Sequence, residues 1–77
     1  MIGMKRAIAK TLESPEVVIR SLADPQAHLY HRFYIGTKVG DKFLCVVVKV
    51  QGNDAFVLTA YLTNKIRRGT VLWRTKL

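Results

Sequence analysis

Three successive runs of alternating residues, separated by short glycine-containing turns, constrain the fold of this chain more than any other feature. The runs extend from His28 to Ile35, from Lys42 to Gln51 and from Ala55 to Leu62. Alternation sends successive side chains to opposite faces of a strand. The intervening segments, Gly36 to Asp41 and Gly52-Asn53-Asp54, are rich in residues that favour tight turns. The pattern therefore predicts consecutive antiparallel hairpins.

A helix and a further strand are expected before these runs. One helical stripe is formed by Met4, Ala7, Ile8, Thr11 and Leu12. Pro15 ends this helix, because the residue before a proline avoids helical backbone angles. The run from Glu16 to Leu22 is rich in β-branched residues, which favours a short strand, and Asp24-Pro25 then marks a turn.

The C-terminal part predicts less regular structure. Thr63 is expected to cap a single helical turn that ends at Gly69, and Val71 to Trp73 to follow as a short last strand or an anchored tail. The predicted fold class is therefore α+β, with an N-terminal helix packed on a four-stranded antiparallel β-meander. We expect one domain spanning residues 1–77, because a chain of this length forms one small core.

The charge of the chain indicates its class of partner. Thirteen basic residues face five acidic ones, and the formal net charge is +8. Such an excess attracts polyanions, so RNA is the expected partner, and an acidic protein such as an antitoxin would also be attracted.

No apolar run is long enough for a membrane span, and the single Cys45 cannot form an internal disulfide. A cytoplasmic location without membrane contact is expected.

Hairpin geometry predicts which side chains share a face of the sheet. A three-residue loop between the last two runs pairs Lys49 with Val57 and Val47 with Thr59. A symmetric hairpin between the first two runs places His28 opposite Lys49, or Tyr30 opposite Lys49 if the register slips by two, and either register puts the same residues on one face. One face is then predicted to be polar and to carry Arg20, His28, Tyr30, Arg32, Tyr34, Lys49, Thr59 and Tyr61. The other face is predicted to pack against the helix and to bury Leu44, Val46, Val48, Phe56, Leu58 and Ala60.

The predicted polar face combines cations and aromatic rings without a carboxylate. Such a face suits a phosphate backbone with bases stacked on the rings, although Thr and Tyr are also common on solvated strand faces. His31 belongs to the opposite, core-facing set and is expected to be a hydrogen-bonded core residue. A basic tail is expected to clamp phosphates or to solubilise the end of the chain, and it consists of Lys65, Arg67, Arg68, Arg74 and Lys76.

The candidate chemistry is cleavage of RNA without a metal or another cofactor. The five carboxylates are scattered along the chain, and no Cys or His spacing is typical of zinc. Metal-free cleavage needs a base for the 2′-hydroxyl proton, an acid for the leaving oxygen and cations for the charged phosphorane. His, Tyr, Lys and Arg side chains of the predicted polar face supply all three roles, but a non-catalytic RNA-binding sheet would use the same residues.

Most of the chain resembles a known family of small bacterial and phage proteins. The segments that carry the resemblance are Thr11 to Glu16, Tyr30 to Tyr34, Phe43 to Lys49, Phe56 to Thr63 and Lys65 to Trp73. They are similar to the phage Barnase–EndoU–colicin–RelE-like nucleases. The resemblance implies a RelE-like fold and a metal-independent ribonuclease that acts as a toxin or phage effector. By position it implies a cleft containing Tyr30, Arg32, Lys49, Thr59 and Tyr61.

Three functions follow from these observations as hypotheses. In a metal-independent ribonuclease, Arg32 and Lys49 would hold the phosphate, His28 or Tyr61 would move protons, and Thr59 would orient the scissile group. In a non-catalytic nucleic-acid-binding module, the same residues would bind without cleavage. In a docking protein, the positive face would attract an acidic partner chain.

Overall fold

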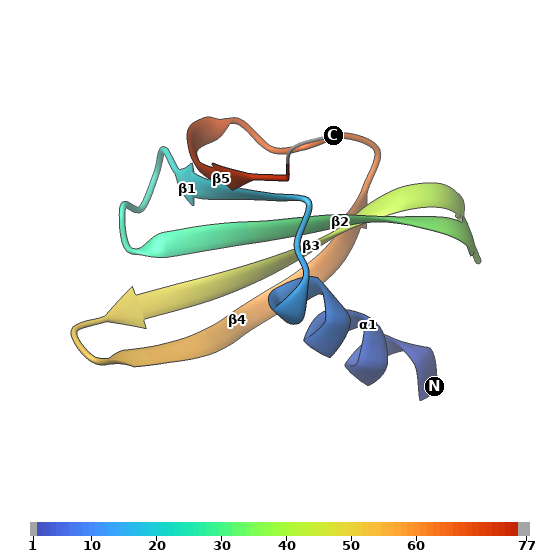
Figure 1. The fold of residues 1–77 in the computed structure, drawn as a ribbon, viewed down its shortest axis with the longest axis horizontal. Coiled ribbons are helices and arrows are strands. Elements are labelled where there is room, and N and C mark those ends of the chain that lie inside the picture. Colours follow the sequence, from blue (N-terminus) through green and yellow to red (C-terminus); the bar gives the residue numbers. More distant parts are fainter. Residues whose placement is uncertain (1, 76–77) are drawn as a thin grey trace.

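The computed structural model describes residues 2–75, with side chains from Lys5 to Thr75, so the predicted places of the Met4 side chain and of Lys76 lie outside the described part. The described residues form one helix and five strands (Figure 1). Their bounds are α1 Ile2–Glu13, β1 Val17–Ser21, β2 Ala27–Thr37, β3 Gly40–Gln51, β4 Asp54–Thr63 and β5 Gly69–Arg74. The prediction of an α+β protein with an N-terminal helix and an antiparallel sheet is confirmed.

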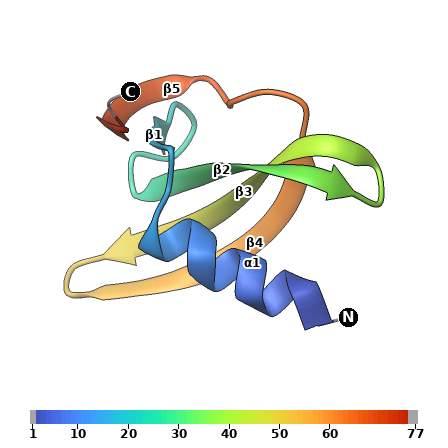
Figure 2. The same ribbon diagram turned by 45° about the vertical axis from the view of Figure 1, so that its right-hand side comes forward.

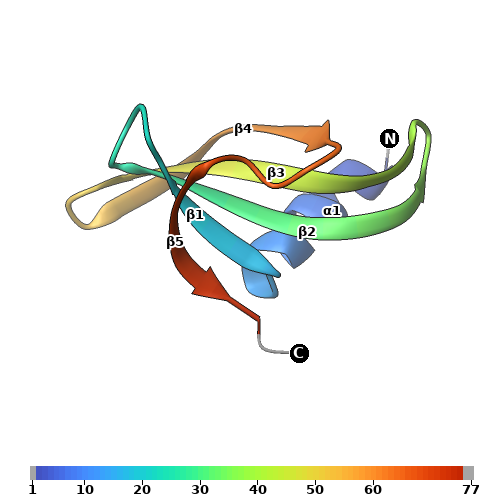
Figure 3. The ribbon, with the colours of Figure 1, turned by 90° about the horizontal axis from the view of Figure 1, so that it is seen from above.

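The sheet has five strands rather than the predicted four, in the order β4-β3-β2-β1-β5. The predicted helical turn before Gly69 is wrong, because residues 64–68 form a non-helical link. This link, hereafter the β4–β5 link, carries the chain from one edge of the sheet to the other (Figures 1 and 3). Of the two alternatives predicted for Val71 to Trp73, a short last strand or an anchored tail, the strand is observed: these residues belong to β5, whose backbone pairs with β1. Without β5, β1 would leave its hydrogen-bonding groups unpaired at the sheet edge.

Helix α1 covers one face of the sheet, which we call the helix face (Figure 2). Leu44, Val46 and Val48 of β3 are buried beneath it and pack with apolar side chains of the helix, namely Ala7, Ile8 and Leu12. The helix ends before Pro15, as predicted. The opposite face has its own buried cluster, formed by Val17, Ile19, Leu29 and Cys45.

A one-residue bulge changes the predicted pairing of β2 with β3. Thr37 pairs with Gly40, as a symmetric hairpin requires, but Tyr34 already pairs with Lys42. Gly36 adopts a φ of 74°, and its backbone N–H donates to Asp41 Oδ1 at 2.9 Å. This arrangement accommodates one extra residue on β2. The register of β2 therefore shifts by one residue, and each of its side chains before the bulge lies on the face opposite to the predicted one.

A second bulge interrupts the pairing of β3 with β4. Val47 pairs with Thr59 as predicted, but Lys49 pairs with Phe56 instead of Val57, and Leu58 is the extra residue. Phe56 and Leu58 are 47% and 52% exposed. Their predicted burial is therefore wrong, whereas the predicted burial of Leu44, Val46 and Val48 is confirmed and Ala60 is half-buried.

Candidate nucleic-acid interface

The bulge beside Gly36 divides the predicted polar face between the two sides of the sheet. His28, Tyr30 and Arg32 pair with Val48, Val46 and Leu44, so they lie on the helix face. Arg20 pairs with His28 and Tyr34 continues the same alternation, which places both residues there too. Lys49, Thr59 and Tyr61 share the opposite face with Cys45 and Val47. The prediction that all eight side chains share one face is wrong, because each side chain follows the register of its own strand.

The helix face contains an open groove of about 830 Å³. Its floor is formed by β1 and β2, and it is bordered by the segment that follows α1 and by β5. Trp73, which is 49% exposed, enters the groove because its strand position is opposite Val18. The groove is lined by Glu13, Ser14, Pro15, Glu16, Val18, His28, Tyr30, Arg32, Leu72, Trp73 and Thr75.

Arg32 and Tyr34 contribute to this region in different ways. The Arg32 guanidinium donates one hydrogen bond, from Nη1 to the Ser14 carbonyl oxygen at 2.7 Å, which satisfies a backbone group just after α1. A guanidinium has four further N–H donors, and Arg32 lines the groove. The Tyr34 hydroxyl instead donates to the Ala7 carbonyl oxygen at 3.0 Å and lies 3.1 Å from the Thr11 hydroxyl. Tyr34 therefore attaches α1 to the sheet and is not a groove residue.

Two carboxylates and one tryptophan of the groove were not predicted as site residues. Glu13 and Glu16 lie beside the end of α1, and Glu16 Oε2 accepts a hydrogen bond from the Phe33 backbone N–H at 3.3 Å. The expectation of a face without carboxylates is therefore wrong on this side of the sheet. Trp73 could not be placed from local sequence, because its position depends on the pairing of β5 with a strand more than fifty residues earlier.

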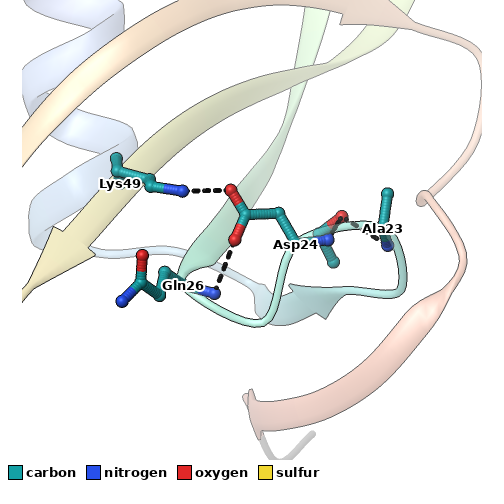
Figure 4. Close-up of polar contacts among 5 residues, drawn as sticks. Ala23, Asp24, Gln26 and Lys49 are labelled. Carbon is teal, nitrogen blue, oxygen red and sulfur yellow. Dashed lines mark hydrogen bonds and ion pairs between the residues drawn. The ribbon is translucent and has the colours of Figure 1, made fainter.

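Lys49 is neutralised by an ion pair on the opposite face. Its ammonium group contacts Asp24, whose second carboxylate oxygen accepts the Gln26 backbone N–H at 3.0 Å (Figure 4). The hydrogen bond from Lys49 and the Gln26 N–H hold the pKa of the Asp24 carboxyl below its usual value. Lys49 therefore has a carboxylate partner within the protein, a contact that the sequence pattern did not predict.

Tyr61 belongs to a polar row that crosses the opposite face. Cys45 on β3 pairs with both His31 on β2 and Tyr61 on β4. Burial lowers the pKa of His31 and raises the pKa values of Cys45 and Tyr61, so the neutral forms are favoured in all three. His31 is buried and hydrogen-bonded, as predicted. A raised pKa disfavours Tyr61 as a base, and the neighbouring Thr59 is exposed.

The predicted basic tail is a link and a strand in the structure. Lys65, Arg67 and Arg68 are exposed on the β4–β5 link, and Arg74 is exposed at the end of β5. The three link cations border a depression that also includes Ser21 and Leu29, and none of the described residues that line it is acidic. Leu29 faces away from α1, so this depression lies on the face of the sheet opposite the groove.

Within residues 2–75, no three His, Cys, Asp or Glu side chains lie close enough together to hold a metal ion. None of the described helical segments is long and apolar enough to cross a membrane. No protein-family model, curated protein or solved structure matches this chain.

Proposed function

We propose that this protein binds single-stranded RNA in the groove of the helix face. The observation that carries the proposal is the presence of two aromatic rings, Tyr30 and Trp73, beside two nitrogen-rich side chains, His28 and Arg32. Aromatic rings stack on unpaired bases of any identity, and cations bind the backbone between them. The formal net charge of +8 supports the encounter with a polyanion.

Trp73 is the only tryptophan of the chain, so its fluorescence reports on the groove directly. We expect a single-stranded RNA oligonucleotide to quench this fluorescence on binding. Trp73→Ala should weaken the affinity about tenfold or more, since stacking on one aromatic ring contributes ~1–3 kcal/mol per base. Phe56→Ala is the matched control, because Phe56 is equally exposed but lies on the far edge strand. Equal affinities of wild type and Trp73→Ala would contradict the proposal.

A metal-independent ribonuclease is the second candidate, and a specific feature of the groove favours it. Glu13 and Glu16 line the same groove as His28 and Arg32. A carboxylate can take the 2′-hydroxyl proton, a histidine can protonate the leaving oxygen, and a guanidinium can bind two phosphate oxygens. In this assignment Arg32 and His28 keep their predicted roles. Lys49, Thr59 and Tyr61 lie across the sheet and take no part. A toxin or phage-effector role, with an acidic antitoxin, belongs to this candidate.

Incubation with total RNA in EDTA separates the two candidates. If the protein is such a nuclease, cleavage should persist in EDTA, and Arg32→Ala should reduce it by ~100- to 1000-fold, the usual effect of losing one transition-state donor. Lys49→Ala is the control, because it removes the same charge from the opposite face. Thermal unfolding of both variants shows whether the loss of the Arg32–Ser14 bond has affected the fold. RNA binding without cleavage would leave the non-catalytic module as the function.

A further inference from the structure

The outer edge of β4 exposes three consecutive large apolar side chains. Phe56, Val57 and Leu58 are 47%, 44% and 52% exposed, and β4 is an edge strand of the sheet (Figure 1). An edge strand also presents backbone N–H and C=O groups that have no neighbouring strand. Proteins usually protect such an edge with lysine or proline, and Asp54–Thr63 contains neither. The bulge at Leu58 bends the edge locally but leaves these side chains in solvent.

These side chains point to both faces of the sheet, and this restricts what can cover them. Val57 pairs with Val48 and so lies on the helix face, whereas Phe56 pairs with Lys49 and lies on the opposite face. A helix or a flat surface docked on one face of the sheet would contact either Val57 or Phe56, but not both. A strand added beside β4 brings side chains to both faces and also bonds the free backbone groups.

The charge distribution selects a second copy of this chain as the occupant. No residue from Ala55 to Asn64 is charged. At the other edge of the sheet, Arg68 precedes β5 and Arg74 ends it, whereas Lys65 follows β4 and the backbone of Arg67 bonds to His31 of β2. An acidic partner would therefore be attracted to the β5 edge, and two copies of a +8 chain would repel each other there. β3 carries two lysines: Lys49 is paired with Asp24, and Lys42 donates a hydrogen bond to Asn64, which follows β4.

Pairing through β4 keeps the cationic edges of two copies far apart. The strand order β4-β3-β2-β1-β5 places β5 four strand spacings from β4. In a dimer joined at β4, nine spacings of ~4.8 Å separate the two β5 strands, a distance of about 43 Å, which far exceeds the screening length of ~8 Å at physiological salt. β4 begins with Asp54 and has no other charged residue, so its edge is the place where two of these chains meet with least repulsion.

We propose that two copies of this protein associate by antiparallel pairing of their β4 strands about a two-fold axis, which joins the two sheets into one of ten strands. In each copy, Phe56, Val57 and Leu58 form one apolar patch. The β4 strand of the other copy would then cover this patch. The grooves lie toward the two outer edges and stay open. This inference does not depend on the RNA-binding proposal.

Analytical ultracentrifugation of the full chain, freed of nucleic acid, tests the dimer. We expect a concentration-dependent monomer–dimer equilibrium that persists or strengthens as salt rises, because salt screens the repulsion between the copies. Val57→Lys and Leu58→Lys should each weaken the dimer about tenfold or more, by placing like charges opposite each other at the interface. Both positions are about half exposed, so lysine is compatible with the monomer fold.

Val71→Lys is the matched control, because Val71 is 53% exposed on the opposite edge strand. This variant should leave the dimer dissociation constant within about twofold. A monomer at every concentration would overturn the proposal, as would a dimer that Val71→Lys disrupts while Val57→Lys does not. Binding of RNA by the Val57→Lys monomer would show that the groove and the dimer edge are separate features.

Discussion

His31 is the polar side chain on which the packing of the opposite face depends most. It is fully buried, its Nδ1 lies 3.1 Å from the Leu29 carbonyl oxygen, and its Nε2 lies 3.2 Å from the Arg67 backbone nitrogen. These contacts assign the neutral tautomer, in which Nδ1–H donates to Leu29 and Nε2 accepts from Arg67. Cys45 is the strand partner of His31, and the Arg67 charge acts on the ring. His31 therefore attaches the β4–β5 link to the central strand of the sheet.

Protonation of His31 should weaken this attachment. Burial lowers its folded-state pKa below the ordinary value of 6.5, so below that pH the unfolded chain binds more protons than the folded one. The contribution of His31 to stability is complete above about pH 6.5 and is lost as the pH falls toward the folded-state pKa. We expect the free energy of unfolding, measured by urea denaturation, to decrease from neutral pH to about pH 5. His31→Gln should remove this dependence, whereas His28→Gln should retain it.

Two leucines with opposite environments distinguish the observed packing from the predicted one. Leu44 is 1% exposed beneath α1, whereas Leu58 is the half-exposed bulge residue of β4. Leu44→Ala should lower the free energy of unfolding by about 2–5 kcal/mol, because it leaves a cavity in the core. Leu58→Ala should cost less than about 1 kcal/mol in dilute solution. Chemical denaturation of both variants measures the difference, and equal costs would contradict the register of β4.

At the scale of the elements, the position of β5 determines the shape of the groove. Residues 69–74 are the most distant in sequence from β1, yet they pair with it along its length. Gly69 makes this approach feasible: its φ is 157°, and a Cβ atom there would lie 2.2 Å from the Arg20 carbonyl oxygen and 2.4 Å from Ile19 Cγ2. Any other residue would push β5 away from β1. The aromatic wall formed by Trp73 depends on this contact.

Gly69→Ala should therefore destabilise the protein by about 1–3 kcal/mol. It should also move Trp73 into a more polar environment, which a red shift of its fluorescence would report. Gly52→Ala is the control, because Gly52 has a φ of 59° in an open turn where an added methyl group would have no atom within 4 Å. Gly52→Ala should lower the free energy of unfolding by about 1–2 kcal/mol, through backbone strain alone, and should leave the Trp73 emission unchanged. An unchanged emission spectrum in Gly69→Ala would contradict the role assigned to this glycine.

At the scale of the whole molecule, charge is distributed unevenly. The groove mixes Arg32 and His28 with two carboxylates, and Lys49 is paired with Asp24. The β4–β5 link instead carries three exposed cations, and none of the residues from 55 to 75 is acidic. A long RNA that occupies the groove would thus find its strongest electrostatic attraction at the link. The groove and the link would make different contributions to binding: stacking in one and counterion release in the other.

Simultaneous replacement of Arg67 and Arg68 by alanine tests this division. The slope of log affinity for single-stranded RNA against log salt should become shallower by about 0.7 for each phosphate that the protein no longer neutralises. Trp73→Ala should reduce the affinity without changing the slope. A double variant with the same loss of charge elsewhere, Lys5→Ala with Lys38→Ala, is the control for a general effect of net charge. An equal change of slope in both double variants would remove the link from the binding surface.

The alternation of residues, the turn residues and Pro15 determine much of the secondary structure of this protein from the sequence alone. They predict the helix, four of the five strands and the pairing of Val47 with Thr59, because these depend on neighbours in sequence. The basic character of the link follows equally from composition. The burial of His31 was also predicted, although its strand register was not.

The tertiary structure alone decided which side chains lie together. One extra residue beside Gly36 moves His28, Tyr30 and Arg32 to the helix face and separates them from Lys49 and Tyr61. Strand alternation has a period of two, so a one-residue bulge reverses every assignment beyond it while the local pattern stays the same. The fifth strand is decided in the same way, because only the complete five-stranded sheet shows that Gly69 fits against β1 and that Trp73 reaches the groove.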